Sequence, residues 1–368
     1  MQTPTPPTGP LCGVRVLEFA GMGPAPFCAM LLSDLGAEVL RVDRRGAVPR
    51  LAVDVTSRGR LSIELDLKSP ADRSVCLDAI RKADVLIEGY RPGVMERLGL
   101  GPEAVAGENP RLIYGRMTGW GQDGPLAQAA GHDINYIALT GALAAMGDPD
   151  RPPSPPLNLV GDFGGGALYL ALGLVAALLE RERSGKGQVV DAAMIDGVAS
   201  LMAVFNGLSA TQPDYLRRGQ VTLAGAAPNY HCYECADGRH IAIGALEPQF
   251  YNNLLAAVGR PYSASERRDP AEWPDQIATL ASIFKTRTRD AWCALLEGTD
   301  ACVAPVLDLQ EARAHPHMVA RGVYAEIAGL AQPAPAPRFS RTPGAIQGPA
   351  PAAGEGGRAR LQSWMETL

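Results

Sequence analysis

Apolar residues fall into short β-branched runs and longer helical segments that alternate along the first half of the chain. A short apolar run bounded by turn residues predicts a buried strand, and a longer segment with apolar positions three or four apart predicts a helix. Residues 14–19 predict a strand, residues 25–35 a helix that ends at Gly36, and residues 38–42 a second strand. A strand, helix and strand in this order imply parallel pairing.

The same alternation continues to about residue 210. Ser69 and Pro70 mark a helix start, because serine is a good cap and proline suits the first helical position. Further strands are predicted at 61–67, 85–88, 111–117 and 188–194, and further helices at 70–82, 133–146, 166–183 and 195–210. Alternating strands and helices predict an α/β fold with a doubly wound, Rossmann-like parallel sheet.

The second half of the chain has a different pattern. Residues 211–228 interrupt the alternation and predict a linker. Beyond them, the runs 231–234 and 240–245 flank Asp237-Gly238, which is a hairpin signal, and helices are predicted at 249–258 and 289–296. We therefore expect residues 1–210, completed by 331–368, to form a large domain and residues 229–330 to form a smaller α+β domain.

Composition and charge narrow the function classes. Hydrophobic residues make up 46% and charged residues 20% of the 368 residues, enough to bury a large core. With 34 basic and 39 acidic residues the formal charge is −5, and no basic block favours nucleic acid. The most apolar run, 167–179, is shorter than the roughly 18 residues that span a bilayer, so it predicts a buried helix and no membrane partner.

The cysteines indicate a reducing compartment. There are seven, an odd and scattered set that does not resemble a disulfide framework in a chain of this length. We expect a cytoplasmic protein.

Two familiar kinds of site are disfavoured by their spacing. Gly21-x-Gly23-x-x-Pro26 with Asp43 resembles a dinucleotide turn, but proline replaces the third small residue and removes a backbone N–H. The pair Cys232-x-x-Cys235 has histidines nearby but lacks a second ligand pair, and neighbouring strand residues point to opposite faces. We expect neither a nicotinamide site nor a metal site.

Two other motifs carry candidate acid–base chemistry. In Gly161–Gly166 the glycines allow close backbone approach, and Asp162 precedes a predicted helix, where it could be either a cap or a catalytic group. In Gly131–Tyr136, His132 precedes a helix whose first N–H groups could hold an oxyanion. A histidine and an aspartate on either side of one carbon would suit proton abstraction next to a carbonyl.

These two motifs resemble the signature stretches of the α-methylacyl-CoA racemases, within the family III CoA-transferase superfamily. The similarity extends from about residue 9 to residue 342. It includes the segments 34–39, 88–93, 185–191, 233–238 and 247–251. The long motifs make the resemblance specific.

The resemblance implies an interlocked homodimer, with each active site between the large domain of one subunit and the small domain of the other. His132 and Asp162 would be the two acid–base groups, and Glu247 the carboxylate that orients His132. Asn158 and Tyr230 would position Asp162, with Asp133 as a further supporting residue. The residues implied for CoA binding are Arg44, Leu65, Asp66, Leu67, Lys68, Gly89, Tyr90, Arg91, Arg97, Gly131, His132, Asp133, Ile134, Asn135 and Tyr136. One departure from the family pattern is the pair His231-Cys232, which follows Tyr230 where smaller polar residues are expected.

The expected function is racemisation of 2-methylacyl-CoA thioesters by a two-base proton transfer through an enolate, with CoA as part of the substrate and no separate cofactor. The main alternative is a family III CoA-transferase in which Asp162 is the acyl-accepting nucleophile. His132 favours the racemase, because the transferases usually lack it. A catalytically silent CoA-binding subunit is a further alternative. Fatty acyl, sterol, bile-acid and arylpropionyl thioesters share the reacting end.

Overall fold

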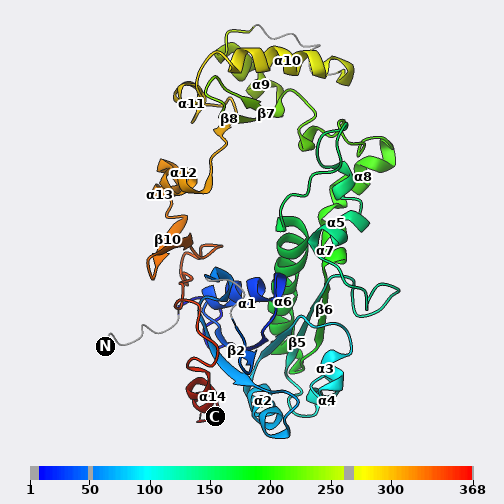
Figure 1. The fold of residues 1–368 in the computed structure, drawn as a ribbon, viewed down its shortest axis with the longest axis vertical. Coiled ribbons are helices and arrows are strands. Elements are labelled where there is room, and N and C mark those ends of the chain that lie inside the picture. The colour runs from blue at the N-terminus through cyan, green and yellow to red at the C-terminus, as the bar shows by residue number, and fades with distance from the viewer. Residues whose placement is uncertain (1–7, 49–52, 261–268, 367–368) are drawn as a thin grey trace. The chain divides into compact units, whose positions relative to one another are not determined.

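The computed structural model describes residues 8–48, 53–260 and 269–366 (Figure 1). The chain forms two compact units. The first comprises Met1–Thr140, Pro156–Leu201 and Val319–Leu368, and the second comprises Gly141–Pro155 and Met202–Met318. These boundaries differ from the expected ones, since the segment predicted as a linker belongs to the second unit and residues 319–330 belong to the first.

The first unit contains a six-stranded parallel sheet, which confirms the predicted α/β class. The strand order is β3-β2-β1-β4-β5-β6. The chain therefore reverses direction of winding between the adjacent strands β1 and β4, as in a doubly wound sheet. The strands are β1 (Arg15–Phe19), β2 (Glu38–Arg44), β3 (Arg60–Leu65), β4 (Val85–Glu88), β5 (Ile113–Thr118) and β6 (Val189–Ala193).

Helices cover both faces of this sheet, each with its own apolar core. On one face, α1 (Pro24–Asp34) and α6 (Leu168–Ser184) pack against the sheet around Val16, Val85 and Leu170. On the other face, α2 (Pro70–Lys82) and the C-terminal α14 (Gly357–Glu366) do so around Leu17, Ile80 and Trp364. The remaining helices of this unit include α3 (Val94–Arg97), α4 (Pro102–Ala106), α5 (Asp133–Leu139) and α7 (Met194–Leu201), and its hairpin is β10 (Tyr324–Ile327) with β11 (Leu330–Pro333).

Two predicted helices are shorter than expected. The helix predicted over 133–146 ends at Leu139, because Gly141 adopts a φ of +83° that ends the regular helix. The helix predicted over 195–210 is broken at Met202 into α7 and α8 (Ala203–Thr211). The apolar pattern runs through both interruptions, so the sequence does not reveal them.

The glycine-rich motif is helical from an earlier point than expected. Leu159–Ala167 forms a π-helical segment, η3, that runs directly into α6. Asp162 thus lies within a helical turn and does not precede it. A Cβ on Gly197 would lie 1.8 Å from the carbonyl oxygen of Gly165, so glycine is needed there for α7 to pack on η3. Wide π-helical turns are frequent at functional sites.

The prediction that the apolar run 167–179 is a buried helix holds for only one face of α6. Its inner face packs on the sheet, but four apolar side chains of its outer face are 40–67% exposed: Leu168, Leu172, Val175 and Leu179. Within the described residues, Leu159–Ser184 is one helical segment long and apolar enough to cross a bilayer, and only 33% of its most apolar window is buried. Spacings of four, three and four place these four residues on one stripe.

The second unit is built on a small antiparallel sheet of β7 (Tyr230–Glu234), β8 (His240–Gly244) and β9 (Val303–Pro305). The hairpin predicted around Asp237-Gly238 is confirmed. The helices α9 (Pro248–Ala257), α10 (Trp273–Phe284) and α11 (Arg289–Leu296) contribute to its core. The apolar core buries Tyr233, Phe284 and Trp292.

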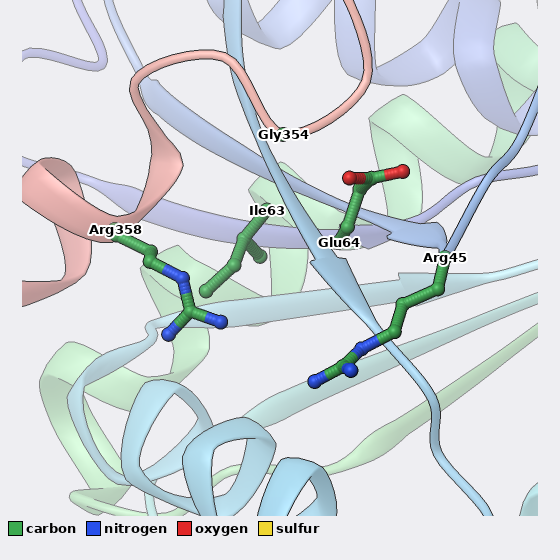
Figure 2. Close-up of a pocket in the computed structure, with 5 residues that line it drawn as sticks. All are labelled: Arg45, Ile63, Glu64, Gly354 and Arg358. Carbon is green, nitrogen blue, oxygen red and sulfur yellow. The ribbon is translucent and has the colours of Figure 1, made fainter.

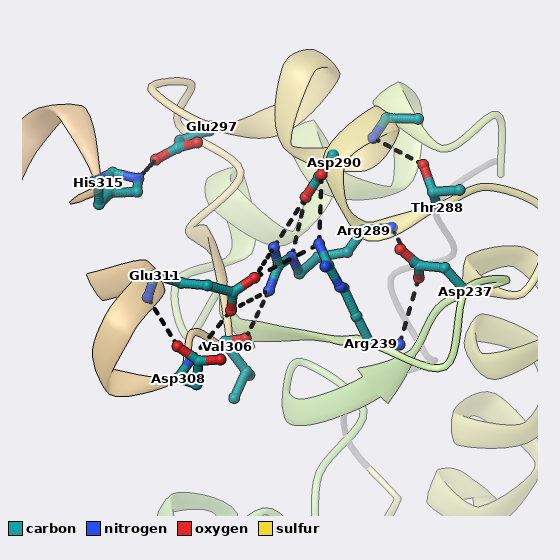
Figure 3. A network of polar contacts seen from close by, with 11 residues as sticks. Asp237, Arg239, Thr288, Arg289, Asp290, Glu297, Val306, Asp308, Glu311 and His315 are labelled. Atoms are coloured by element: carbon teal, nitrogen blue, oxygen red, sulfur yellow. Dashed lines mark hydrogen bonds and ion pairs between the residues drawn. The ribbon is translucent and has the colours of Figure 1, made fainter. Parts of the chain in front are cut away.

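A polar network fastens the helix α12 (Leu309–Ala314) to α11 and β8 (Figure 3). The Arg289 guanidinium donates two hydrogen bonds, of 2.9 and 2.8 Å, to the Glu311 carboxylate. Arg239 lies 3.5 Å from the same carboxylate, and these contacts lower the pKa of Glu311 to about 2. Asp308 caps α12 by accepting the Glu311 backbone N–H. The long connection after β9 is therefore held in place by charge-assisted hydrogen bonds.

Candidate active site

The carboxyl ends of the six parallel strands lie at one edge of the sheet. Open parallel sheets bind ligands at this edge, near the place where the winding reverses, which here is between β1 and β4. The turn Gly21–Gly23 follows β1, and Gly89–Arg91 follows β4. The segment that leads to His132 follows β5, so the motifs singled out in the sequence lie at this edge.

His132 lies at the exposed start of α5, next to a pair of packed aromatic rings. The Trp120 and Tyr136 rings are 4.7 Å apart between centroids and meet edge to face at 82°. The Tyr136 hydroxyl donates a 2.5 Å hydrogen bond to the carbonyl of Gly131. A Cβ on Gly131 would lie 2.8 Å from the Tyr136 ring and 2.9 Å from the Trp120 ring. Glycine is therefore required for the loop to lie on these rings.

Asp133 joins the His132 motif to the Asp162 motif. The backbone N–H of Asp162 donates a 2.7 Å hydrogen bond to Asp133 Oδ2. The Asn158 side chain in turn donates a 3.1 Å hydrogen bond from Nδ2 to Asp162 Oδ2. The structure thus brings His132, Asp133, Asn158 and Asp162 into one cluster, although they come from two separate motifs of the sequence.

Asp162 is in an environment that favours its protonated form. Burial raises the pKa of this carboxyl, the hydrogen bond from Asn158 lowers it, and the negative charge of Asp133 raises it again. The charge of His132 lowers it by a smaller amount, and the net direction is upward. A carboxyl with a raised pKa is a better proton donor and acceptor near neutral pH than an ordinary aspartate.

The turn between β1 and α1 packs directly against Asp162. A Cβ on Gly23, whose φ is +68°, would lie 3.0 Å from Asp162 Oδ2. Next to it, the Phe27 and Phe163 rings lie 4.4 Å apart between centroids. Gly23 belongs to the turn that resembles a dinucleotide motif, and in this structure it leaves room for the Asp162 carboxylate.

The side chains expected to bind CoA differ in their accessibility. Exposed basic residues end or follow three strands at the carboxyl edge: Arg44, Lys68, Arg91 and Arg97. Leu65, by contrast, is 2% exposed and lies in the core, so its side chain is not available to a ligand. Tyr90 packs edge to face on Phe19, at 6.3 Å between ring centroids, and burial is the main reason its pKa rises to about 12.

The rest of the residues expected to bind CoA lie in three places along the chain. Asp66 donates its backbone N–H to Asp72, and Leu67 packs at the margin of the core. In α5, Ile134 is 45% exposed, and Asn135 accepts the backbone N–H of His132 through its side-chain oxygen, at 3.0 Å. Gly89 is exposed after β4.

Tyr230 and Glu247 lie in the second unit. Tyr230 begins β7 and pairs with Gly244, and Glu247 immediately precedes α9. His231, the departure from the family pattern, has its Nδ1 2.5 Å from the carbonyl oxygen of Gly225, and Cys232 is exposed. The association of Tyr230 and Glu247 with the His132 cluster stays a prediction.

A separate cavity of about 380 Å³ lies by the edge strand β3 (Figure 2). The guanidinium groups of Arg45 and Arg358 point into it from opposite sides, next to Glu64. Arg45 is already paired with Asp72 at 2.8 Å, and Glu64 accepts a backbone N–H. Its lining has both signs of charge and none of the acid–base residues. Among the described residues, no three His, Cys, Asp or Glu side chains form a group that could hold a metal ion.

Three contributions to this site could not be predicted from the sequence. Trp120 had no signal in the sequence, because a lone tryptophan in a polar loop is not distinctive. Gly23 was noticed for its spacing, but its contact with Asp162 depends on how η3 packs against α1. The hydrogen bond from the Asp162 backbone to Asp133 likewise follows from the packing of two helices and not from any motif.

The chain is similar to known proteins along most of its length. The sequence model of CoA-transferase family III matches residues 11–356. The chain is 46% identical to the alpha-methylacyl-CoA racemase of Mus musculus and 44% identical to that of Homo sapiens, in each case over 90% of this chain and 87% of the relative. A CAIB/BAIF family protein from Brucella suis has a similar structure, with a TM-score of 0.83, 26% identity and coverage of 97% of this chain and 100% of that one. These findings confirm the resemblance seen in the two motifs, and the chain belongs to CoA-transferase family III.

Proposed function

We propose that this protein is a 2-methylacyl-CoA racemase that inverts the C2 stereocentre of branched acyl-CoA thioesters. The observation that carries the proposal is the cluster in which Asp162, with a raised pKa, is tied to the residue that follows His132. The two relatives named as alpha-methylacyl-CoA racemases support the same activity. The protein is then an isomerase.

The proposed reaction is a proton transfer between two bases. In one direction the Asp162 carboxylate removes the C2 proton and the protonated His132 delivers a proton to the opposite face. In the other direction the two roles are exchanged. The thioester makes the C2 proton acidic enough for an enolate to form. The N–H groups of Asp133 and Ile134, at the start of α5, would face its oxygen.

CoA is proposed to lie along the carboxyl edge of the sheet. The exposed Arg44, Lys68, Arg91 and Arg97 supply positive charge at this edge, as its phosphates require. The thioester would then reach the His132 cluster beside β1 and β4. No cofactor besides the CoA of the substrate is needed for this chemistry. Because the seven cysteines form an odd and scattered set that does not resemble a disulfide framework, we also propose a cytoplasmic location.

We further propose a homodimer. The exposed stripe on α6, formed by Leu168, Leu172, Val175 and Leu179, has the spacing of a helix–helix seam. Burying each of these side chains stabilises an interface by about 1.5–3 kcal/mol, which disfavours leaving the stripe in water. A second copy would also allow Tyr230 and Glu247 of one subunit to complete the site of the other, with Glu247 orienting His132.

Isotope exchange tests the proposed activity. In D₂O, the wild-type protein should introduce deuterium at C2 of a 2-methylacyl-CoA while the two epimers equilibrate. His132→Ala and Asp162→Ala should each lower the exchange rate by several orders of magnitude without unfolding the protein. Full exchange by Asp162→Ala would exclude it from the acid–base pair.

A CoA-transferase is the second candidate, because the family as a whole carries that name. In that reaction the Asp162 carboxylate would attack the thioester carbonyl and expel the CoA thiolate, leaving an acyl anhydride on the aspartate. Incubation with acyl-CoA and hydroxylamine would trap this intermediate on Asp162. A labelled Asp162 together with CoA transfer to a second acid, and no exchange at C2, would replace the racemase by the transferase.

A further inference from the structure

The Asp133 carboxylate occupies a buried position between the two catalytic motifs. Asp133 is 7% exposed, although aspartate is rarely buried without a partner. Its Oδ2 accepts the backbone N–H of Asp162 at 2.7 Å, and its Oδ1 is buried with no hydrogen-bond partner in the described structure. Such a half-satisfied carboxylate is costly to the fold, so a functional reason is expected.

The neighbouring turn is shaped around this carboxylate. A Cβ on Gly161 would lie 2.4 Å from Asp133 Oδ2 and 2.8 Å from its Cγ. The residue before Asp162 must therefore be glycine for the hydrogen bond to form. In the π-helical segment η3, this bond fixes the peptide group from which the Asp162 side chain projects.

We propose that Asp133 is a positioning residue, whose carboxylate holds the turn that presents Asp162 to the C2 proton and whose negative charge acts on the Asp162 carboxyl. This inference rests on the proposed racemase function. The Asp133 side chain does not touch the reacting atoms and acts through Asp162, whereas Asn158 holds the Asp162 carboxylate itself.

The charge of Asp133 is one of few that act on Asp162. The others are His132, which opposes it, and the Tyr136 phenol, whose own pKa is raised by burial and by the Asp162 charge. Of the elements packed on this turn, the turn before α1 contributes Gly23 and α7 contributes Met194, Gly197 and Val198, and none of these residues is charged. Removal of the Asp133 charge should therefore lower the pKa of Asp162.

Two substitutions separate the two roles. Asp133→Asn keeps an oxygen that can accept the Asp162 N–H but removes the charge. Its exchange rate at the optimum should stay within about tenfold of wild type, and the acid limb of its pH–rate profile should move to lower pH. Asp133→Ala removes both, and because a misplacement of about 1 Å can cost about 100-fold in rate, its exchange should fall by about that factor.

Deuterium exchange at C2, measured over a range of pH, tests this inference. Asp196→Asn, which removes one exposed negative charge from α7, is the matched control and should leave the acid limb in place. Either of two results would overturn the positioning role. One is an Asp133→Asn variant that exchanges at the wild-type rate with an unshifted acid limb, and the other is an Asp133→Ala variant with full activity. If Asp133→Ala does not fold, the position of the acid limb in the pH–rate profile of Asp133→Asn alone tests the positioning role. Absence of exchange in the wild-type protein would instead refute the proposed function.

Discussion

Gly23 offers a direct test of where the reactive carboxylate lies. Its backbone has φ +68° and ψ −117°, a region that is open to glycine and strained for residues with a Cβ. Strain of this kind costs about 1–3 kcal/mol of folding free energy. A Cβ would also lie 3.0 Å from Asp162 Oδ2, so that the carboxylate must move by a few tenths of an ångström.

The Gly23→Ala variant should therefore lose stability and activity for separate reasons. The free energy of unfolding should fall by about 1–3 kcal/mol because of the backbone. Since a displacement of about 1 Å can cost about 100-fold in rate, a shift of a few tenths predicts a loss of about 3- to 10-fold in C2 exchange. Chemical denaturation measures the first quantity and deuterium incorporation the second.

Gly13→Ala is the matched control. Gly13 also has a positive φ, of +87°, but a Cβ there would meet no atom within 4 Å. It should lose stability and retain the exchange rate of the folded protein. The reasoning is refuted if Gly23→Ala exchanges as fast as wild type, or if both variants lose exchange to the same degree once the folded fraction is taken into account.

Three further predictions concern stability, assembly and pH. The Glu18 carboxylate is fully buried and lies 2.6 Å from the Arg60 guanidinium, so Arg60→Met leaves it without this partner. Chemical denaturation should show that the free energy of unfolding falls by about 3–5 kcal/mol, and this loss should shrink at acidic pH. Adding Glu18→Leu to the same chain should restore part of the lost stability. Leu172→Lys should shift the protein toward the monomer in sedimentation equilibrium. Val48→Lys, at an exposed site outside α6, should not. A monomeric wild-type protein would refute the homodimer. Because the pKa of Asp162 is raised in the folded protein, its ionised form opposes folding above the ordinary carboxyl pKa of about 3.9. Asp162→Asn should then raise Tm at pH 7 while abolishing exchange, and the gain in Tm should vanish as the pH falls below that value; an unchanged or lower Tm at pH 7 would contradict the raised pKa.

Local sequence determined most of the strands and helices of this protein. The strand Val85–Glu88 and the helix Arg289–Leu296 were predicted with the bounds that the structure shows. In both, the apolar pattern and the flanking polar residues agree, and no distant contact competes with them. The C-terminal helix Gly357–Glu366 was not predicted, because it contributes only a few apolar residues to the core, among them Leu361 and Trp364.

The candidate catalytic pair was recognised from its motifs, but its arrangement was decided by tertiary packing. The sequence places His132 and Asp162 next to glycines, and the structure joins their segments through a hydrogen bond between Asp133 and the Asp162 backbone. The exposed face of α6 is a second example. The apolar outer face of a helix can be covered by another part of the same chain or by another molecule. The sequence pattern indicates only that the face is apolar. Contacts between residues far apart in the chain depend on the path of the backbone, so only the tertiary structure decides them.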